Sequence, residues 1–556
     1  MARAAVALAL VLGAALAIPA AAAAVPDAQG TLPTGPFVAR VYYAHISDLD
    51  ALAGYDMWET NNLVLRYVLV SMDRGIWDDL RMQGWRLEVD PDATAMLHPD
   101  VKFGRGDSFS GGYRTVAELQ ADLASINAAN PIITDLVDYG DSWCKTGGGC
   151  MTPGGDFSPG WDLQAIRVTN EAIPGPKPVY FLVANVHARE ITTPELAMNM
   201  LDWLITGYGT NADVTWIVDH QETWIVPSIN PDGHWIVELG ALPQYGGTPF
   251  MQRKTANDSA FCATWPPNSF SHYGVDGNRN HSFNWNTGGS TSAACDQTYR
   301  GVSAASEPET SALEALVIAH VPDQRGPLPS NAAPATTQGI LITMHSYGGL
   351  VLWPWGNTTQ AAPNKTGLKA IGDKLATYNG YQSCQPPTCL YAVSGNTDDF
   401  SYGVLGIPSF TIEVGTQFMP PFSQIASIQW PGNGPALQYA AKIARTPYKM
   451  VNGPDALNVA AAASGTNRII TATLDETKNG GQTVKGAVYF LDTPQWKAGI
   501  KKPMQPADGA FNSTVEGATV TISTVGLTPG QHIVWVYGQD SALNIGPPAA
   551  VFFTVP

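Results

Sequence analysis

Four apolar runs without polar alternation constrain the fold of this 556-residue chain more than any other feature. In chain order they are "VYFLVANV", "TWIVPSIN", "GILITMH" and "SFTIEV". Runs of this kind are typical of strands buried on both faces, in a mostly parallel sheet covered by helices. Helical segments fall between them, as "PELAMNMLDWLITGYG", "EPETSALEALVIAHV" and "KTGLKAIGDKLATYNG". The sequence therefore predicts an α/β domain whose twisted, mostly parallel or mixed sheet carries helices on both faces.

Regions of different character flank this predicted domain, which spans residues 113–446. Residues 37–95 predict a small α/β unit, with strands at "ARVYY" and "LVLRYVLVS" and helices at "ISDLDALAGY" and "DRGIWDDLRMQG". The Gly/Ser-rich "KFGRGDSFSGGYR" that follows is typical of an exposed linker. Residues 453–556 hold short strands separated by turn residues, which favours a β-sandwich.

The first 24 residues indicate export. "MARAAVALALVLGAALAIPAAAAA" combines Arg3, an apolar run and Ala-x-Ala sites near Ala22 and Ala24, which is the pattern of a signal peptide. We expect a mature protein that is extracellular or periplasmic and has no membrane span, since no other stretch approaches about 20 apolar residues. The net charge of -17 argues against a nucleic-acid partner, because binding phosphates needs basic stripes.

The six cysteines fall into three pairs that are close in sequence: Cys144/Cys150, Cys262/Cys295 and Cys384/Cys389. Local disulfides in an oxidising compartment explain this distribution. A Cys-ligated zinc site is the rival interpretation, but it would need a tighter paired spacing. The sequence therefore favours three disulfides.

Two of the apolar runs end in a histidine. His187 and Glu190 stand three residues apart in "HARE", just past the first run, and His345 ends "GILITMH". Histidine nitrogen and carboxylate oxygen are normal zinc ligands, and a catalytic zinc site takes three protein ligands. The motif "HARE" alone is short and weak, and the third ligand could also be one of three other histidines: His234, His272 or His281.

Other polar groups follow the same strands. Asn230 and Asp232 come after the second run, and Glu413 lies at the end of the fourth. In open α/β sheets the binding crevice lies outside the carboxyl ends of the strands, so these groups are expected at one edge. After "HARE", Thr192 and Glu195 predict an N-cap and a capping box for the helix that follows.

Taken together and in this order, the motifs resemble the zinc carboxypeptidases of the pancreatic carboxypeptidase A and B type, including secreted bacterial relatives of the carboxypeptidase T type. The resemblance covers residues 113–446. It implies one Zn²⁺ per chain, with His187, Glu190 and His345 as ligands. In "GVDGNRN" it places Asp276 on the carboxylate that orients the first zinc histidine.

The same resemblance implies roles in catalysis and substrate binding. Arg253 in "MQRKT" would polarise the scissile carbonyl, and Glu413 in "FTIEVG" would be the general base. Asn278 and Arg279, helped by Arg189, would bind the free terminal carboxylate of a peptide. This last contact implies an exopeptidase, because an internal peptide bond offers no carboxylate.

Three further residues would shape the substrate cleft. Tyr347 in "HSYG" would line it, and Tyr391 would cap bound substrate. Asp398, seven residues after Tyr391, would lie at the base of the pocket for the terminal side chain. Because a buried carboxylate needs a cationic partner, a preference for Lys or Arg ends, or a dual basic and apolar preference, is expected.

The predicted function is therefore that of a secreted zinc metallocarboxypeptidase acting on peptides and proteins, in which the unit at residues 37–95 resembles an inhibitory pro-segment. One alternative is a cell-wall peptide amidase or a deacylase on the same fold, which need not keep the whole set of Tyr391, Arg253, Asn278 and Arg279. A second alternative is a non-catalytic zinc-binding relative, which would usually have lost the base or a ligand. No sequence feature indicates an oligomeric state.

Overall fold

The computed structural model describes residues 32–98, 111–328 and 330–556. Residues Gly35–Pro556 belong to one compact unit. The predicted signal peptide and most of the predicted linker lie outside the described residues. Among the described residues, no helix has the length and apolar character needed to cross a membrane.

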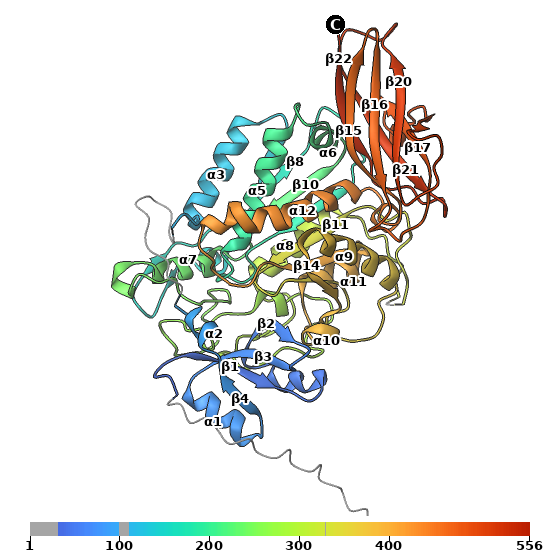
Figure 1. The fold of residues 1–556 in the computed structure, drawn as a ribbon. Coiled ribbons are helices and arrows are strands. Elements are labelled where there is room, and N and C mark those ends of the chain that lie inside the picture. Colours follow the sequence, from blue (N-terminus) through green and yellow to red (C-terminus); the bar gives the residue numbers. More distant parts are fainter. Residues whose placement is uncertain (1–31, 99–110, 329) are drawn as a thin grey trace, which may run out of the picture. The chain divides into compact units, whose positions relative to one another are not determined.

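An eight-stranded sheet forms the centre of the fold, in the order β13-β12-β14-β11-β9-β10-β8-β5 (Figure 1). The four predicted apolar runs are its parallel middle strands, β9 (Val179–Val183), β10 (Glu222–Val226), β11 (Ile340–His345) and β14 (Ser409–Glu413). The predicted fold class is thus confirmed, as a mixed sheet. Its outer strands are β5 (Thr134–Asp141), β8 (Asp162–Val168), β12 (Leu350–Leu352) and β13 (Gln382–Cys384), three of which pair antiparallel with an inner neighbour.

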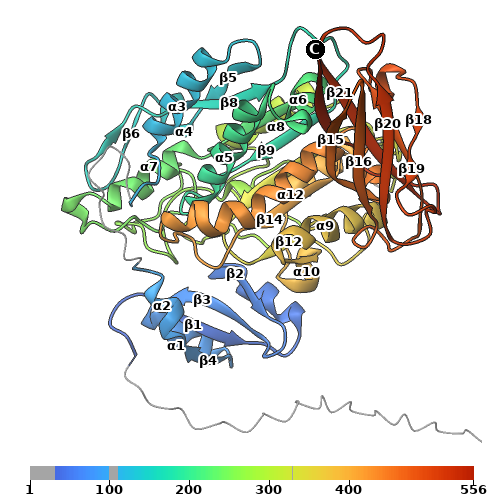
Figure 2. The same cartoon turned by 45° about the horizontal axis from the view of Figure 1, so that its top comes forward.

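Helices cover both faces of this sheet (Figure 2). Successive strand residues point to opposite faces, and in β9 Leu182 packs with one set of helices while Phe181 and Val183 pack with the other. Each such side chain contributes about 1.5–3 kcal/mol by leaving water. The first set is α5 (Thr192–Gly207), α6 (Ala212–His220), α9 (Lys365–Asn379) and α12 (Trp430–Ile443), and the second is α8 (Pro308–His320) and α11 (Thr397–Leu405).

The remaining helices of this region are mostly short, except for α3 (Val116–Ala129), which adds Leu119 and Leu123 to the core of the first set. The others are α4 (Trp143–Thr146), α7 (Pro231–Gly240), η2 (Pro243–Tyr245), η3 (Gly277–Arg279), α10 (Pro386–Cys389), the π-helix η4 (Ile425–Gln429) and α13 (Pro447–Met450). A two-stranded ribbon joins β6 (Cys150–Met151) to β7 (Phe157–Ser158).

The predicted cap of α5 is wrong. Ile191 is the N-cap and makes no side-chain cap bond, while Thr192 is already helical. Glu195 instead accepts a hydrogen bond at 2.9 Å from the backbone N–H of Arg114, and the side chains of these two residues form an ion pair. A capping box was predicted from local spacing, but a partner 81 residues away takes the carboxylate.

The N-terminal region, residues 37–95, forms a four-stranded antiparallel sheet in the order β2-β3-β1-β4. Its elements are β1 (Phe37–Tyr42), η1 (Ile46–Leu52), β2 (Asp56–Asn62), β3 (Tyr67–Met72), α1 (Arg74–Met82), β4 (Arg86–Val89) and α2 (Pro91–Ala95). The second predicted strand starts too early, because residues 63–66 form a turn in which Arg66 has φ 55°. Strand β2 was missed because its acidic and amide residues carry no apolar pattern.

The C-terminal region holds two four-stranded sheets, β15-β16-β20-β19 and β18-β17-β21-β22, which pack over a shared apolar core as a β-sandwich (Figure 1, red). Their strands are β15 (Asp455–Ser464), β16 (Asn467–Asp475), β17 (Val484–Leu491), β18 (Lys502–Pro503), β19 (Gln505–Pro506), β20 (Val515–Ser523), β21 (Gly530–Asp540) and β22 (Ala549–Val555), with η5 (Gln495–Lys497) between β17 and β18.

This sandwich shares a core with the central domain. Trp535 and Tyr537 of β21 belong to the same buried cluster as Trp216 of α6. Lys374 of α9 is buried and forms an ion pair with Asp455 at the start of β15. Removing residues 453–556 would therefore expose aromatic surface and leave the buried charge of Lys374 without its ion-pair partner.

The three predicted disulfides are present, as Cys144–Cys150, Cys262–Cys295 and Cys384–Cys389, and none of the six cysteines is free. A zinc site made of cysteines is thereby excluded.

Candidate active site

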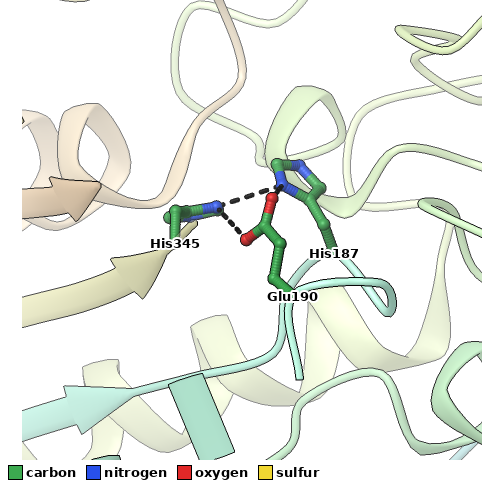
Figure 3. A group of neighbouring side chains, drawn as sticks. All are labelled: His187, Glu190 and His345. Atoms are coloured by element: carbon green, nitrogen blue, oxygen red, sulfur yellow. Dashed lines mark hydrogen bonds and ion pairs between the residues drawn. The ribbon is translucent and has the colours of Figure 1, made fainter. Parts of the chain in front are cut away.

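The predicted metal ligands converge at the carboxyl ends of two neighbouring strands. His187 and Glu190 lie on the turn after β9, and His345 is the last residue of β11, which runs parallel to β9. One ligand atom of each residue lies within 4.8 Å of the other two (Figure 3). The Nδ1 atoms of the two histidines are 3.1 Å apart, and His345 Nδ1 is 3.1 Å from Glu190 Oε2. Among the described residues no other group of this kind occurs.

Each of the two histidines has a polar neighbour on the Nε2 side of its ring. His187 Nε2 lies 3.2 Å from Asp276 Oδ1, and His345 Nε2 lies 3.3 Å from Thr343 Oγ1. With Nε2 as the donor in each ring, both Nδ1 lone pairs face the cluster. Burial lowers the pKa of His187 and brings the pKa of His345 to about 3, so both rings are neutral.

The donor set fits a zinc ion. Two neutral imidazole nitrogens and one carboxylate are a normal catalytic zinc set. With these tautomers and no cation, the two nitrogen lone pairs would face each other at 3.1 Å, and His187 Nδ1 would face Glu190 Oε1 at 2.6 Å with no proton between them. The three histidines left open as alternatives lie elsewhere: none of His234, His272 and His281 belongs to the cluster.

Asp276 links the cluster to the arginines. Besides His187, it accepts bonds from Nε and Nη2 of Arg253, both at 3.1 Å, and Arg279 Nη1 lies 3.8 Å away. Burial alone would raise the pKa of Asp276, but the two guanidinium groups hold it well below its usual range. Asp276 is therefore an anion that orients both a candidate ligand and Arg253.

Glu413 ends β14, in register with His345 on β11. Its side chain is 4% exposed, and its Oε2 has no hydrogen-bond partner. Burial raises the pKa of Glu413 well above its ordinary value, and the nearby carboxylates of Glu59 and Glu190 raise it further. Glu413 thus presents a proton-accepting oxygen beside the cluster.

A small cavity lies against these groups. Its walls bring together seven of the predicted site residues: His187, Arg253, Asn278, Arg279, Tyr391, Asp398 and Glu413. Five predicted residues do not line it: Glu190, His345, Asp276, Tyr347 and Arg189. Tyr347 is packed edge-on against Trp58 and Phe418, and Arg189 is fully buried in an ion pair with Asp56 at 2.8 Å.

Comparison with known proteins gives the same assignment as the site. The pattern of the family described as zinc carboxypeptidase matches residues 155–429. A zinc carboxypeptidase of Simulium vittatum is 30% identical over 249 residues, which cover 43% of this chain and 70% of that protein. This chain belongs to the zinc carboxypeptidase family. Zinc carboxypeptidase A 1 of Anopheles gambiae is 29% identical over 312 residues, covering 54% of this chain and 60% of that relative, which is less than two thirds of its length.

Among solved structures, carboxypeptidase A of Helicoverpa armigera shares the fold of this family member. The two superpose with a TM-score of 0.55 at 21% identity, over 73% of this chain and 98% of that one. Because of the low identity, this likeness bears on the fold alone.

Two adjacent buried acids, of which only the first lines the cavity, begin helix α11 in this family member. Asp398 is 1% exposed, and its Oδ1 accepts a hydrogen bond from Asn396 Nδ2. Asp399 does not line the cavity and accepts from the backbone N of Gly356 at 3.0 Å. Burial raises the pKa of Asp398 to about 6, and burial together with Asp398 raises that of Asp399 well above its usual value.

Sequence reasoning missed Glu59 of β2. Its Oε1 accepts a bond at 2.9 Å from Arg253 Nη1, and its Oε2 is buried without a partner at the cavity wall. The only local signal is an acid beside Trp58 in a strand, which says nothing about a partner 194 residues away. The N-terminal region therefore places two acids, Asp56 and Glu59, against two arginines of the site.

Proposed function

We propose that this metallocarboxypeptidase is exported, binds one Zn²⁺ through His187, Glu190 and His345, and removes the last residue of peptides, with a preference for Lys or Arg. The observation that carries the proposal is one cavity lined by a candidate ligand (His187), an unpaired carboxyl oxygen (Glu413), two arginines (Arg253 and Arg279) and a buried acid (Asp398). Export is supported by the signal-peptide pattern and by the three disulfides, which persist in oxidising compartments.

The residues supply the acid–base steps of peptide hydrolysis. When bound, zinc supplies a Lewis acid and lowers the pKa of a coordinated water to about 7. Glu413 accepts a proton from the attacking water at its free Oε2 and returns it to the departing amine nitrogen. Arg253, which Asp276 holds through Nε and Nη2, directs Nη1 at the carbonyl oxygen on which negative charge develops.

Asn278 and Arg279 supply the contact that makes the enzyme an exopeptidase. Arg279 donates through Nε to the carbonyl of Gly289 and through Nη1 to that of Asn278, at 2.8 and 2.9 Å. Its Nη2 is the nitrogen left for a ligand in the cavity. A peptide carboxylate bound there would place the final peptide bond beside Glu413.

Zinc binding has a direct test. Removing the metal with a chelator should abolish peptidase activity, and added Zn²⁺ should restore it. Two imidazole nitrogens and one carboxylate are a normal set of protein ligands for a catalytic zinc ion. His345→Ala should lower the measured zinc content of purified protein from one ion per chain to well below one. His281→Ala, which alters a buried histidine outside the cluster, is the matched control and should retain zinc. A His345→Ala protein with one tightly bound zinc would contradict the ligand assignment.

The N-terminal region is proposed to hold the enzyme inactive until it is cut away. Glu59 accepts a hydrogen bond from Arg253 Nη1, the atom that would otherwise donate to the carbonyl oxygen of the scissile peptide bond. Asp56 accepts a hydrogen bond from Arg189. A buried ion pair of this kind is strongly destabilised when one partner is removed, because the other charge is left unpaired. Two acids on one strand would thus block the cleft without being cleaved.

Glu59→Gln in the uncut chain without its signal peptide should therefore raise basal peptidase activity, by about tenfold or more if 1.4 kcal/mol of the inhibitory contact is lost. Glu88→Gln is the matched control, since Glu88 lies in the same sheet but pairs with Tyr42 and Arg40. Rates before and after proteolytic trimming give the measurement. An uncut wild-type chain as active as the trimmed one would contradict the inhibitory role.

A further inference from the structure

A chain of buried polar side chains leads from the proposed carboxylate clamp into the protein. Asn278 Oδ1 accepts from the backbone N of Thr397 at 3.1 Å and from its Oγ1 at 3.3 Å. Thr397 Oγ1 lies 3.0 Å from His281 Nε2, and His281 Nδ1 lies 3.0 Å from Glu314 Oε1. All four side chains are buried, and they come from η3, the residues after it, α11 and α8.

The first contact decides which way the Asn278 amide points. An amide side chain has an acceptor oxygen and a donor NH₂ of nearly equal shape, so only its partners distinguish the two orientations. The backbone N–H of Thr397 can only donate, and its hydroxyl donates to the same atom, so the two groups together select the oxygen. The NH₂ group is then turned toward the cavity that Asn278 lines, where it can donate to an anion.

His281 fixes the hydroxyl of Thr397 in turn. Glu314 also accepts hydrogen bonds from the backbone N and the Oγ of Ser282, both at 2.7 Å. Burial by itself would raise the pKa of Glu314, but its contacts with His281 and Ser282 outweigh burial and lower that pKa. Facing this anion, His281 Nδ1 carries a proton. Its Nε2 faces Thr397 Oγ1 at 3.0 Å and donates to it, which leaves the single hydroxyl proton of Thr397 for Asn278 Oδ1 and holds the Thr397 rotamer.

Packing keeps the imidazole of His281 in this position. Its ring stacks on Phe400 with an interplanar angle of 18°, and its backbone N donates to Gly395 O at 2.9 Å. Gly395 has φ 70°, and a Cβ there would lie 2.5 Å from the carbonyl oxygen of Arg279. The loop before α11 therefore packs directly against the backbone of Arg279.

We propose that Thr397, His281 and Glu314 are positioning residues that hold the Asn278 amide with its N–H groups toward the terminal carboxylate of the peptide. None of them touches the substrate. This positioning role rests on the proposed function, in which Asn278 and Arg279 bind the terminal carboxylate of the peptide.

The test compares Thr397→Val with Thr397→Ser in the trimmed enzyme. Valine keeps the branched shape but loses the hydroxyl, so KM for peptides should rise about tenfold while kcat changes less than about twofold, as expected for a lost bond to a charged ligand. Serine restores the hydroxyl and should restore KM. His281→Phe keeps a ring against Phe400 and should raise KM by about as much as Thr397→Val does. Combining His281→Phe with Thr397→Val should raise KM little further, since both act through the amide of Asn278.

Calorimetric binding of free arginine and of arginine amide separates positioning from general damage. The wild type should bind the acid much more tightly than the amide, and Thr397→Val should narrow that difference. Equal weakening of both ligands, or a fall in kcat at constant KM, would overturn the inference. A wild type that binds the acid selectively but hydrolyses no peptide would instead refute the proposed function and leave the clamp intact.

Discussion

Glu413→Gln should leave the fold and the bound zinc unchanged while removing nearly all peptide turnover. The amide is nearly isosteric with the carboxylate, but it cannot accept the proton of the attacking water. General-base catalysis typically contributes about 10²–10⁴-fold, and we expect kcat to fall by at least this factor. The variant also loses no hydrogen bond at Oε2, because that atom has no partner in the wild type.

Zinc content and the affinity for free arginine should match the wild type in Glu413→Gln, since both depend on other residues. A matched control is Glu314→Gln, an acid close to the clamp but outside the cavity walls, which should act mainly on KM. Substantial turnover by Glu413→Gln with full zinc content would show that another group is the base.

The centre of the sheet could be predicted because its strands are buried on both faces, which leaves an uninterrupted apolar run in the sequence. Some outer strands give no such signal. In β5, for example, only Thr134 is buried, and Asp135, Asp138 and Asp141 are exposed, so no apolar run marks the strand. A half-exposed edge has too few buried positions to distinguish it from a loop.

The candidate site was predictable wherever a strand end delivers the side chain. His345 and Glu413 lie opposite each other on adjacent parallel strands, so strand order alone brings them together. Contacts that depend on docking of separate regions could not be predicted. Arg189 was assigned to substrate, but it is occupied by Asp56, 133 residues away, because the N-terminal region packs against the site.

Replacing Asp398 should change which terminal side chain the enzyme accepts. Asp398 is buried in the cavity wall, and among the described residues its side chain accepts a hydrogen bond from the neutral amide of Asn396. A terminal Lys or Arg would supply the missing counter-charge, and losing one partner of such a buried pair costs about 3–5 kcal/mol. Asp398→Ala should therefore lower kcat/KM for Arg-ended peptides by about 10²–10³-fold and change it little for Leu-ended ones.

The pH dependence of this selectivity follows from the raised pKa of Asp398, about 6. Below that pH the carboxyl is protonated and cannot pair with a cation, and above it the carboxylate is available. Selectivity for Arg-ended over Leu-ended peptides should therefore rise between about pH 5 and pH 7 in the wild type and stay flat in Asp398→Ala. Asp399→Asn is the matched control, because it changes the neighbouring acid without altering the cavity wall and should keep the preference. Equal losses on both peptides in Asp398→Ala would show that this carboxylate does not select the side chain.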